Sequence, residues 1–174
     1  MHPEMILKQF QCLSQHYMEE MKKYTWEDFN RKPSAASWSL GEMYTHVIET
    51  GYLQMKSLLA CLEVPENHAL KKTFAGKVVY FIGGIPPIKA KVPPSAEGTA
   101  YPPSSREELI KKMNVLEQQM EQALPIVMGA SPDRKIEHPY FGYINAREWY
   151  YHILMHVKHH LRQKKRIDSF LNNR

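Results

Sequence analysis

Apolar residues recur every three or four positions in four long stretches of the chain, and this pattern predicts four amphipathic helices. The first covers residues 3–29, the second residues 40–62 and the third about residues 105–123, while the fourth follows Asn145 and extends to about Phe170. In the fourth stretch the apolar positions alternate spacings of four and three without interruption. Four such helices around one core predict an all-α four-helix bundle.

Capping residues mark the predicted helix starts. Ser39 and Glu42 form an S-x-x-E capping box, in which each side chain satisfies a free backbone amide of the first turn. Asn145 begins the fourth helix, with a glutamate three positions later, and one of the serines at 104 and 105 begins the third. Pro125 is expected to end or kink the third helix.

The connection between the second and third predicted helices is unusually long. Residues 64–104 are rich in proline and glycine, and their apolar run Val78–Ile82 fits either a strand or a helical turn. We interpret this segment as an ordered, loop-rich excursion within a single domain covering residues 1–174, because long loops inside compact domains are often functional. Residues 129–143 are expected to form a second loop.

Composition narrows the class of protein. The chain has 174 residues, of which 43% are hydrophobic and 24% charged, as in ordinary globular proteins. The sequence contains no window of 18 uninterrupted apolar residues, so no transmembrane helix is predicted. The N-terminus does not resemble a secretory signal. The two cysteines, Cys12 and Cys61, form no CxxC motif, so a cytoplasmic protein with reduced thiols is expected, with a bridge between them left open.

The net charge of +5 points only weakly to an anionic partner. The basic residues of the predicted fourth helix, Arg162, Lys164, Lys165 and Arg166, are interpreted as a solvated face near a helix C-terminus. No nucleic-acid-binding motif accompanies them. We therefore expect a small-molecule substrate, and neither a nucleic acid nor a membrane as partner.

Histidines occupy core positions of the fourth predicted helix. His156 and His160 are four residues apart on the apolar stripe, and Gln163 continues it. Buried imidazoles need partners for their ring nitrogens, and a divalent cation supplies one because neutral histidine is a common metal ligand. His46, on the core side of the second helix, is the best third ligand. Three histidines leave a coordination position open, which is typical of catalytic metal sites.

Alternative interpretations of these histidines remain open at this point. His152 is also four residues from His156, but it lies beside the apolar stripe. His159 points about 100° away from His160 and is expected to face solvent. An HxxxH pair on a helix is also compatible with a hydrogen-bonded core network that binds no metal.

Three sequence blocks resemble a known family. They are the HPYFG run at 138–142, AREW at 146–149 and HVKHHLRQ at 156–163, and a fourth match is the Trp38-Ser39 pair followed by His46. Together they are similar to the DinB/YfiT-like superfamily, whose members are regarded as metal-dependent enzymes. The resemblance implies an up-down-down-up bundle in which His46, His156 and His160 hold the metal. It also implies that a low-molecular-weight thiol is a candidate cosubstrate, as in some relatives.

The sequence thus predicts a metal-dependent enzyme, either a thiol-dependent S-transferase or a hydrolase. Zinc and nickel are the first metals expected at an imidazole site, with iron and manganese as alternatives. Glu49, one turn after His46, is the candidate general base. The competing hypothesis is a non-catalytic metal-binding stress-response protein that acts as a homodimer.

Overall fold

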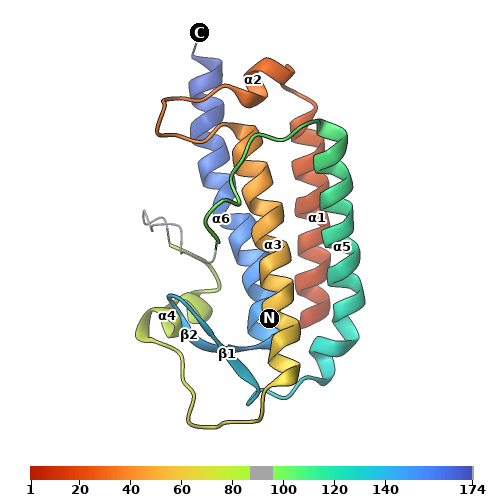
Figure 1. Ribbon diagram of the computed structural model, residues 1–174, viewed down its shortest axis with the longest axis vertical. Helices are drawn as coiled ribbons and strands as arrows, with labels where there is room; N and C mark the ends of the chain where they lie inside the picture. Colours follow the sequence, from red (N-terminus) through yellow and green to blue (C-terminus); the bar gives the residue numbers. More distant parts are fainter. Residues whose placement is uncertain (87–95, 174) are drawn as a thin grey trace.

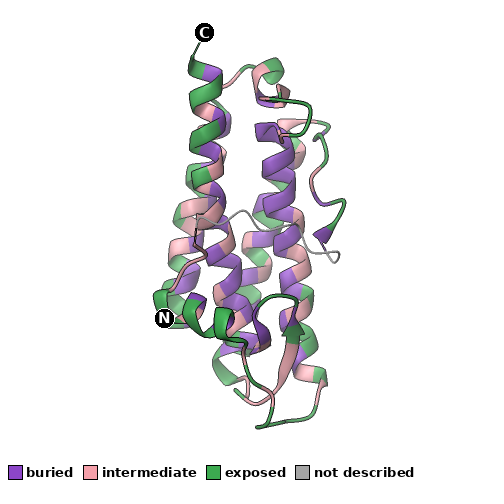
Figure 2. Cartoon of the chain, turned by 90° about the vertical axis from the view of Figure 1, so that its left-hand side faces the viewer, coloured by how far each residue is buried: buried purple, intermediate pink, exposed green. Residues whose placement is uncertain are grey.

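The computed structural model describes residues 1–86 and 96–173 and is mostly helical (Figure 1). Four long helices lie side by side: α1 (Pro3–Met21), α3 (Leu40–Glu63), α5 (Arg106–Gly129) and α6 (Ala146–Asn172). Both α3 and α1 pack against α5 and α6, so the buried faces of the long helices meet in one core (Figure 2). The described residues also form the short helices α2 (Trp26–Asn30) and α4 (Phe74–Ile82), and the strands β1 (Lys135–His138) and β2 (Gly142–Asn145).

The predicted capping residues begin three of the long helices. The Ser39 hydroxyl accepts a hydrogen bond from the Glu42 amide, and the Glu42 carboxylate accepts one from the Ser39 amide. Asn145 forms the same reciprocal box at the start of α6. Ser105 is the N-cap of α5, where its hydroxyl accepts the amide hydrogen of Glu108. These contacts join residues no more than three positions apart, so the start of each of these helices is determined locally and does not depend on tertiary packing.

The first predicted helix is wrong at its C-terminal end. It stops at Met21, and a new helix, α2, begins after Thr25, whose hydroxyl accepts the amide hydrogen of Asp28. The break turns Phe29 back over the core, where its ring packs edge-on against Tyr44 with the centroids 5.1 Å apart. Phe29 is fully buried as a result. The apolar spacing in the sequence continues across the break after Met21, because α1 and α2 both turn apolar residues towards the same core.

Two further expectations are corrected. The third helix does not end at Pro125, because α5 continues to Gly129. Pro125 therefore lies inside α5, where it lacks the amide for one hydrogen bond of the ladder. The kink expected as the alternative to a helix end stays a prediction. Residues 129–143 do not form only a loop: β1 and β2 pair as an antiparallel hairpin in which Lys135 faces Asn145 and His138 faces Gly142. The hairpin leads directly into α6.

The long connection contains a helix. Its Val78–Ile82 run forms the second half of α4, which begins after Thr73 and ends at Gly83, a glycine with a left-handed φ of 67°. The backbone of residues 71–73 hydrogen-bonds to the β1–β2 hairpin, which places α4 beside it at one end of the molecule (Figure 1). Residues 87–95 of the predicted excursion lie outside the described residues.

The basic stretch near the end of α6 is not entirely solvated. Lys164 is buried, and its ammonium group lies 2.9 Å from a carboxylate oxygen of Glu20 and 2.9 Å from one of Asp168. The Tyr24 hydroxyl is 2.8 Å from the same nitrogen. Lys164 therefore belongs to an ion-pair network that ties α1 to α6.

Two remaining expectations concern the thiols and membrane spans. Cys12 is exposed and Cys61 is buried, and both thiols are free. Within the described residues, no helix combines the length and the apolar character needed to cross a bilayer.

Candidate metal centre

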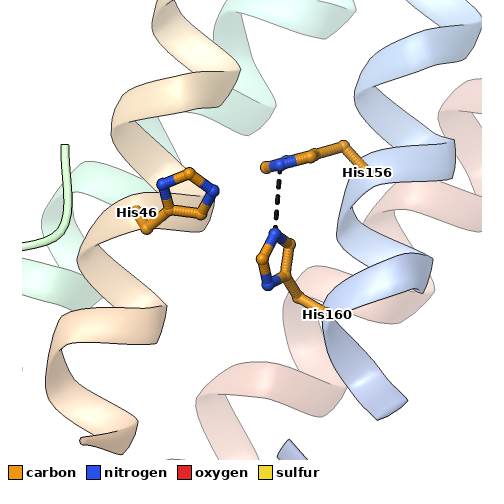
Figure 3. Close-up of side chains that lie close together, drawn as sticks. All are labelled: His46, His156 and His160. Atoms are coloured by element: carbon orange, nitrogen blue, oxygen red, sulfur yellow. Dashed lines mark hydrogen bonds between the residues drawn. The ribbon is translucent and has the colours of Figure 1, made fainter. Parts of the chain in front are cut away.

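Three histidines converge between α3 and α6. His46 reaches across from α3 towards His156 and His160, which lie on consecutive turns of α6 (Figure 3). One ring nitrogen from each residue lies within 4.8 Å of those of the other two. The predicted trio is therefore assembled by the packing of α3 against α6, and these histidines are positioned to hold a metal ion.

A threonine from the long connection orients the imidazole of His46. The Thr99 hydroxyl oxygen lies 2.7 Å from Nδ1 of His46, and the same hydroxyl donates to the Ala96 carbonyl. Because its hydrogen is used there, Thr99 accepts from His46, which places the His46 proton on Nδ1. The Nε2 lone pair of His46 is then free for a metal, an arrangement common among histidine ligands.

Gln163 has the same effect on His160. The side-chain oxygen of Gln163 lies 2.8 Å from Nδ1 of His160 and accepts a hydrogen bond from it. The proton of His160 is therefore on Nδ1, and Nε2 carries the lone pair. This Nε2 faces Nε2 of His156 at 3.1 Å. On the far side of its ring, His156 has a buried Nδ1 that lacks a hydrogen-bond partner among the described residues.

The three imidazoles are neutral near pH 7. Burial, assisted by the neighbouring His159, lowers the pKa of His46 to about 4. Burial and the proximity of His46 lower the pKa of His160 to about 3. The pKa of His156 is also well below its ordinary value, first because of burial and then because His160 and His46 are close. Neutral imidazoles bind metals without first releasing a proton, so the site is electrostatically prepared for a cation.

The donor set fits a divalent ion such as zinc. Two imidazole nitrogens on a tetrahedral zinc ion, each about 2.0–2.1 Å from the metal, lie about 3.3 Å apart. The 3.1 Å separation between His156 and His160 is close to that spacing. Without a metal, Nε2 of His156 and Nε2 of His160 share one hydrogen between them. A cation between the two nitrogens would bind the lone pair of each. Three protein ligands leave at least one coordination position for water or a substrate.

Trp38 forms one wall of the centre. Its ring lies 4.7 Å from that of His46 and 6.4 Å from that of His160, measured between centroids. Both of these histidines are buried, whereas His156 is only partly so. The indole therefore covers His46 and His160, whereas part of the His156 side chain reaches the surface.

The competing histidines lie elsewhere. His152 is buried and its ring packs 4.8 Å from that of His138, so it faces the β1–β2 hairpin and is not part of the convergent trio. His159 is half-buried, which differs from the expected solvent-facing position. Its ring packs perpendicular to that of His160, and the backbone of Ile85 lies beside it.

Glu49 lies one turn beyond His46 in a cluster of polar side chains. Its carboxylate accepts hydrogen bonds from the Tyr101 hydroxyl at 2.8 Å and from the Lys112 ammonium at 3.0 Å. It is not one of the three convergent side chains. Its assignment as general base stays a prediction.

Two features of the centre had not been recognised in the sequence. Thr99 lies 53 positions after His46, and no spacing rule links a loop threonine to a helical histidine. Trp38 belongs to the family match in the sequence, but nothing in the sequence places its ring against His46 and His160. The sequence carries no specific signal for either contact, because Thr99 lies within the long connection and Trp38 lies just before the second predicted helix.

The mostly helical fold and the three converging histidines are those expected of a DinB-like protein. The model of the DinB superfamily matches residues 9–163, which is most of the chain, and this protein belongs to that superfamily. The chain is also similar to the uncharacterized protein YuaE of Bacillus subtilis (strain 168). The two are 26% identical over 149 residues, which cover 85% of this chain and 88% of YuaE.

Proposed function

We propose that this protein is a metal-dependent enzyme whose divalent ion is held by His46, His156 and His160. The observation that carries the proposal is the convergence of three neutral imidazoles, two of which have their Nδ1 protons accepted by neighbouring side chains. Metal ligands whose second nitrogen is fixed in this way are typical of functional metal sites. In a purely hydrogen-bonded core, Nε2 of His156 would donate its hydrogen to Nε2 of His160. A metal would instead be bound by the lone pairs of both nitrogens, with the hydrogen of His156 on Nδ1.

The reaction class proposed is nucleophilic transfer or hydrolysis. A divalent ion in this site would lower the pKa of a bound thiol or water, so that it becomes nucleophilic near neutral pH. Zinc and nickel suit the all-imidazole donor set best, and iron and manganese are the alternatives to be tested. With a thiol cosubstrate the enzyme would be an S-transferase, and with water a hydrolase.

The chain's own residues would orient the ligands and exclude water. Thr99 and Gln163 hold the ring planes of His46 and His160, and Trp38 covers both. Glu49 is proposed as the general base, although this role requires its carboxylate to exchange Tyr101 or Lys112 for the substrate. The partly exposed side of His156 is the proposed direction of substrate entry.

Family membership and the side-by-side helices also support a finer description of the fold. We propose that α1, α3, α5 and α6 form an up-down-down-up four-helix bundle in a single domain. The homodimer belongs to the competing, non-catalytic hypothesis, and analytical sedimentation of the full chain would test it.

Metal content tests the site directly. Untagged protein purified without chelator is expected to contain about one equivalent of a divalent metal, as one three-ligand site requires. The His46→Ala and His160→Ala variants should lose it, whereas His16→Ala, at an exposed position on α1, should retain it. If the parent is metal-free and fails to bind added zinc or nickel, the metalloenzyme proposal is wrong.

Activity separates the enzyme from a non-catalytic metal-binding protein. The metal-loaded protein would be assayed with thiols plus electrophiles and with a panel of esters and amides. Turnover that is abolished in His156→Ala supports the enzyme. Stoichiometric metal binding without turnover across the panel would favour the non-catalytic stress-response protein.

A further inference from the structure

Helix α4 is firmly attached along one face. The Thr73 hydroxyl caps it by accepting the Gly76 amide hydrogen and donates in turn to the Tyr140 carbonyl. At the other end, the Tyr80 and Tyr151 hydroxyls donate to backbone carbonyls that join α4 to α6. Gly76 packs so closely on the hairpin that an added Cβ would lie 2.3 Å from the Phe141 carbonyl oxygen. The orientation of α4 is therefore determined by its contacts.

The opposite face of α4 is apolar and open to solvent. Phe74 is 83% exposed and Phe81 is 89% exposed, and Ile82 and Val78 beside them are 57% and 39% exposed. These positions follow the i, i+4, i+7, i+8 pattern of one helix face. Burying two phenylalanines would normally stabilise a fold, so a fixed helix that presents both to water is typical of a binding surface.

The charged side chains that the described residues place on and just before α4 are lysines. Lys71, Lys72 and Lys77 lie between Glu66 and the end of α4, and no aspartate or glutamate lies there. Lys77 is on α4 itself, is exposed and forms no ion pair with any residue in the described ranges. Lys72, by contrast, pairs with Glu148. An exposed apolar helix face bordered by an unpaired lysine combines two attractions that hold protein surfaces on anionic membranes, the burial of apolar area and the contact of a cation with lipid phosphate.

We propose that the exposed face of α4 binds the surface of anionic lipid bilayers. Phe74, Phe81 and Ile82 would enter the headgroup region while Lys77 contacts lipid phosphates. This differs from the expectation of no membrane partner, which did not take the exposed face of α4 into account. The proposal concerns attachment to a surface and is independent of the metal centre.

A second copy of the chain fits this face less well. The apolar area does not separate the two occupants, because roughly 500 Å² of apolar surface is about the apolar part of what each partner in a stable dimer buries. The charge separates them: a two-fold contact would bring a second copy of Lys77 to the same small surface. Lys77 has no ion-pair partner among the described residues. An anionic bilayer has the complementary charge and no minimum area of contact.

Vesicle co-sedimentation of the full chain tests the proposal. The protein is expected to sediment with vesicles made of equal parts phosphatidylcholine and phosphatidylglycerol, but not with phosphatidylcholine alone. The double variant Phe74→Ser/Phe81→Ser should bind the anionic vesicles at least tenfold more weakly, since both inserted rings are lost. Lys77→Ala should weaken binding about fivefold, and added salt should weaken the parent.

Matched controls separate a specific face from general hydrophobicity. The double variant Met5→Ser/Met128→Ser removes exposed apolar side chains from α1 and α5 and should bind as the parent does. Helical content and metal content should be unchanged in every variant, so a failed metal assay and a failed vesicle assay can be told apart. The proposal is overturned if the parent does not bind anionic vesicles or if the control loses binding equally. A parent dimer that Phe74→Ser/Phe81→Ser converts to a monomer would also overturn it, since the occupant would be a second copy.

Discussion

Nδ1 of His160 lies 2.8 Å from the side-chain oxygen of Gln163, one turn further along α6. This contact selects the tautomer of His160 that presents Nε2 to a metal. Gln163→Leu removes the acceptor, and we expect it to weaken zinc binding about 10–100-fold, the usual effect of losing such a partner. Competition with a chromogenic chelator measures the affinity.

Gln163→Glu provides the rescue for this prediction. It keeps an oxygen acceptor at the same position and should bind zinc within a few-fold of the parent. Gln15→Leu, at an exposed site on α1, is the matched control. Unchanged affinity in Gln163→Leu would show that packing alone orients His160.

Thr99→Val tests the corresponding contact of His46. Without the hydroxyl, the Nδ1 proton of His46 is left with Thr50, whose oxygen is 3.4 Å away. We expect about a tenfold loss of zinc affinity, and rescue by Thr99→Ser. Thr45→Val is the control, because this buried threonine hydroxyl bonds only to a carbonyl of its own helix. Equal losses in Thr99→Val and Thr45→Val would contradict a specific role for Thr99.

The stability of the metal-free protein should fall below about pH 6.5, and His138 should account for part of the loss. Nδ1 of His138 accepts hydrogen bonds from the Tyr140 and Phe141 amides, and burial lowers the pKa of His138 to about 4 from an ordinary 6.5. Between these values the unfolded chain binds more protons than the folded one. Stability is therefore full above about pH 6.5 and decreases as the pH falls towards 4.

The loss attributable to His138 is on the order of 3 kcal/mol. His138→Asn keeps an acceptor near the Nδ1 position but does not titrate. Its free energy of unfolding, measured with urea from pH 7 to pH 4, should therefore decrease less steeply than that of the parent. His16→Asn, at an exposed position, should leave the profile unchanged. Parallel profiles for His138→Asn and the parent would exclude this contribution.

Lys164→Met should destabilise the fold although it adds apolar surface. The Lys164 ammonium bridges Glu20 and Asp168, and its removal leaves two carboxylates facing each other. Removing one partner of a buried pair costs about 3–5 kcal/mol, and the partial exposure of both carboxylates reduces the expected cost to about 2 kcal/mol. Chemical denaturation measures it. Lys165→Met, one position along and exposed, should change the stability by less than about 0.5 kcal/mol.

The same substitution should change the acid properties of Glu20. Its pKa is lowered to about 2, chiefly by hydrogen bonds from Lys23 and Lys164. In Lys164→Met the pKa of Glu20 should rise towards its ordinary value, which carboxylate NMR titration can follow. An unchanged pKa would mean that Lys23 alone holds the carboxylate.

The helix starts could be predicted because their signals are local. The capping boxes of Ser39 and Asn145 act within three residues, and the apolar period shows which face of each helix is buried. The same period placed His156 and His160 on one buried stripe. The break after Met21 was missed because periodicity describes a face and not the continuity of the backbone.

The sequence by itself determined that His156 and His160 lie one turn apart on the apolar stripe of one helix. Only the tertiary structure decided that His46 meets them, since contact between α3 and α6 depends on the packing of the whole core. It also decided the role of Thr99 and the burial of Lys164, because both depend on partners more than 50 residues away in the chain. Local chemistry can be read along a sequence, whereas a site shared between helices exists only after they pack.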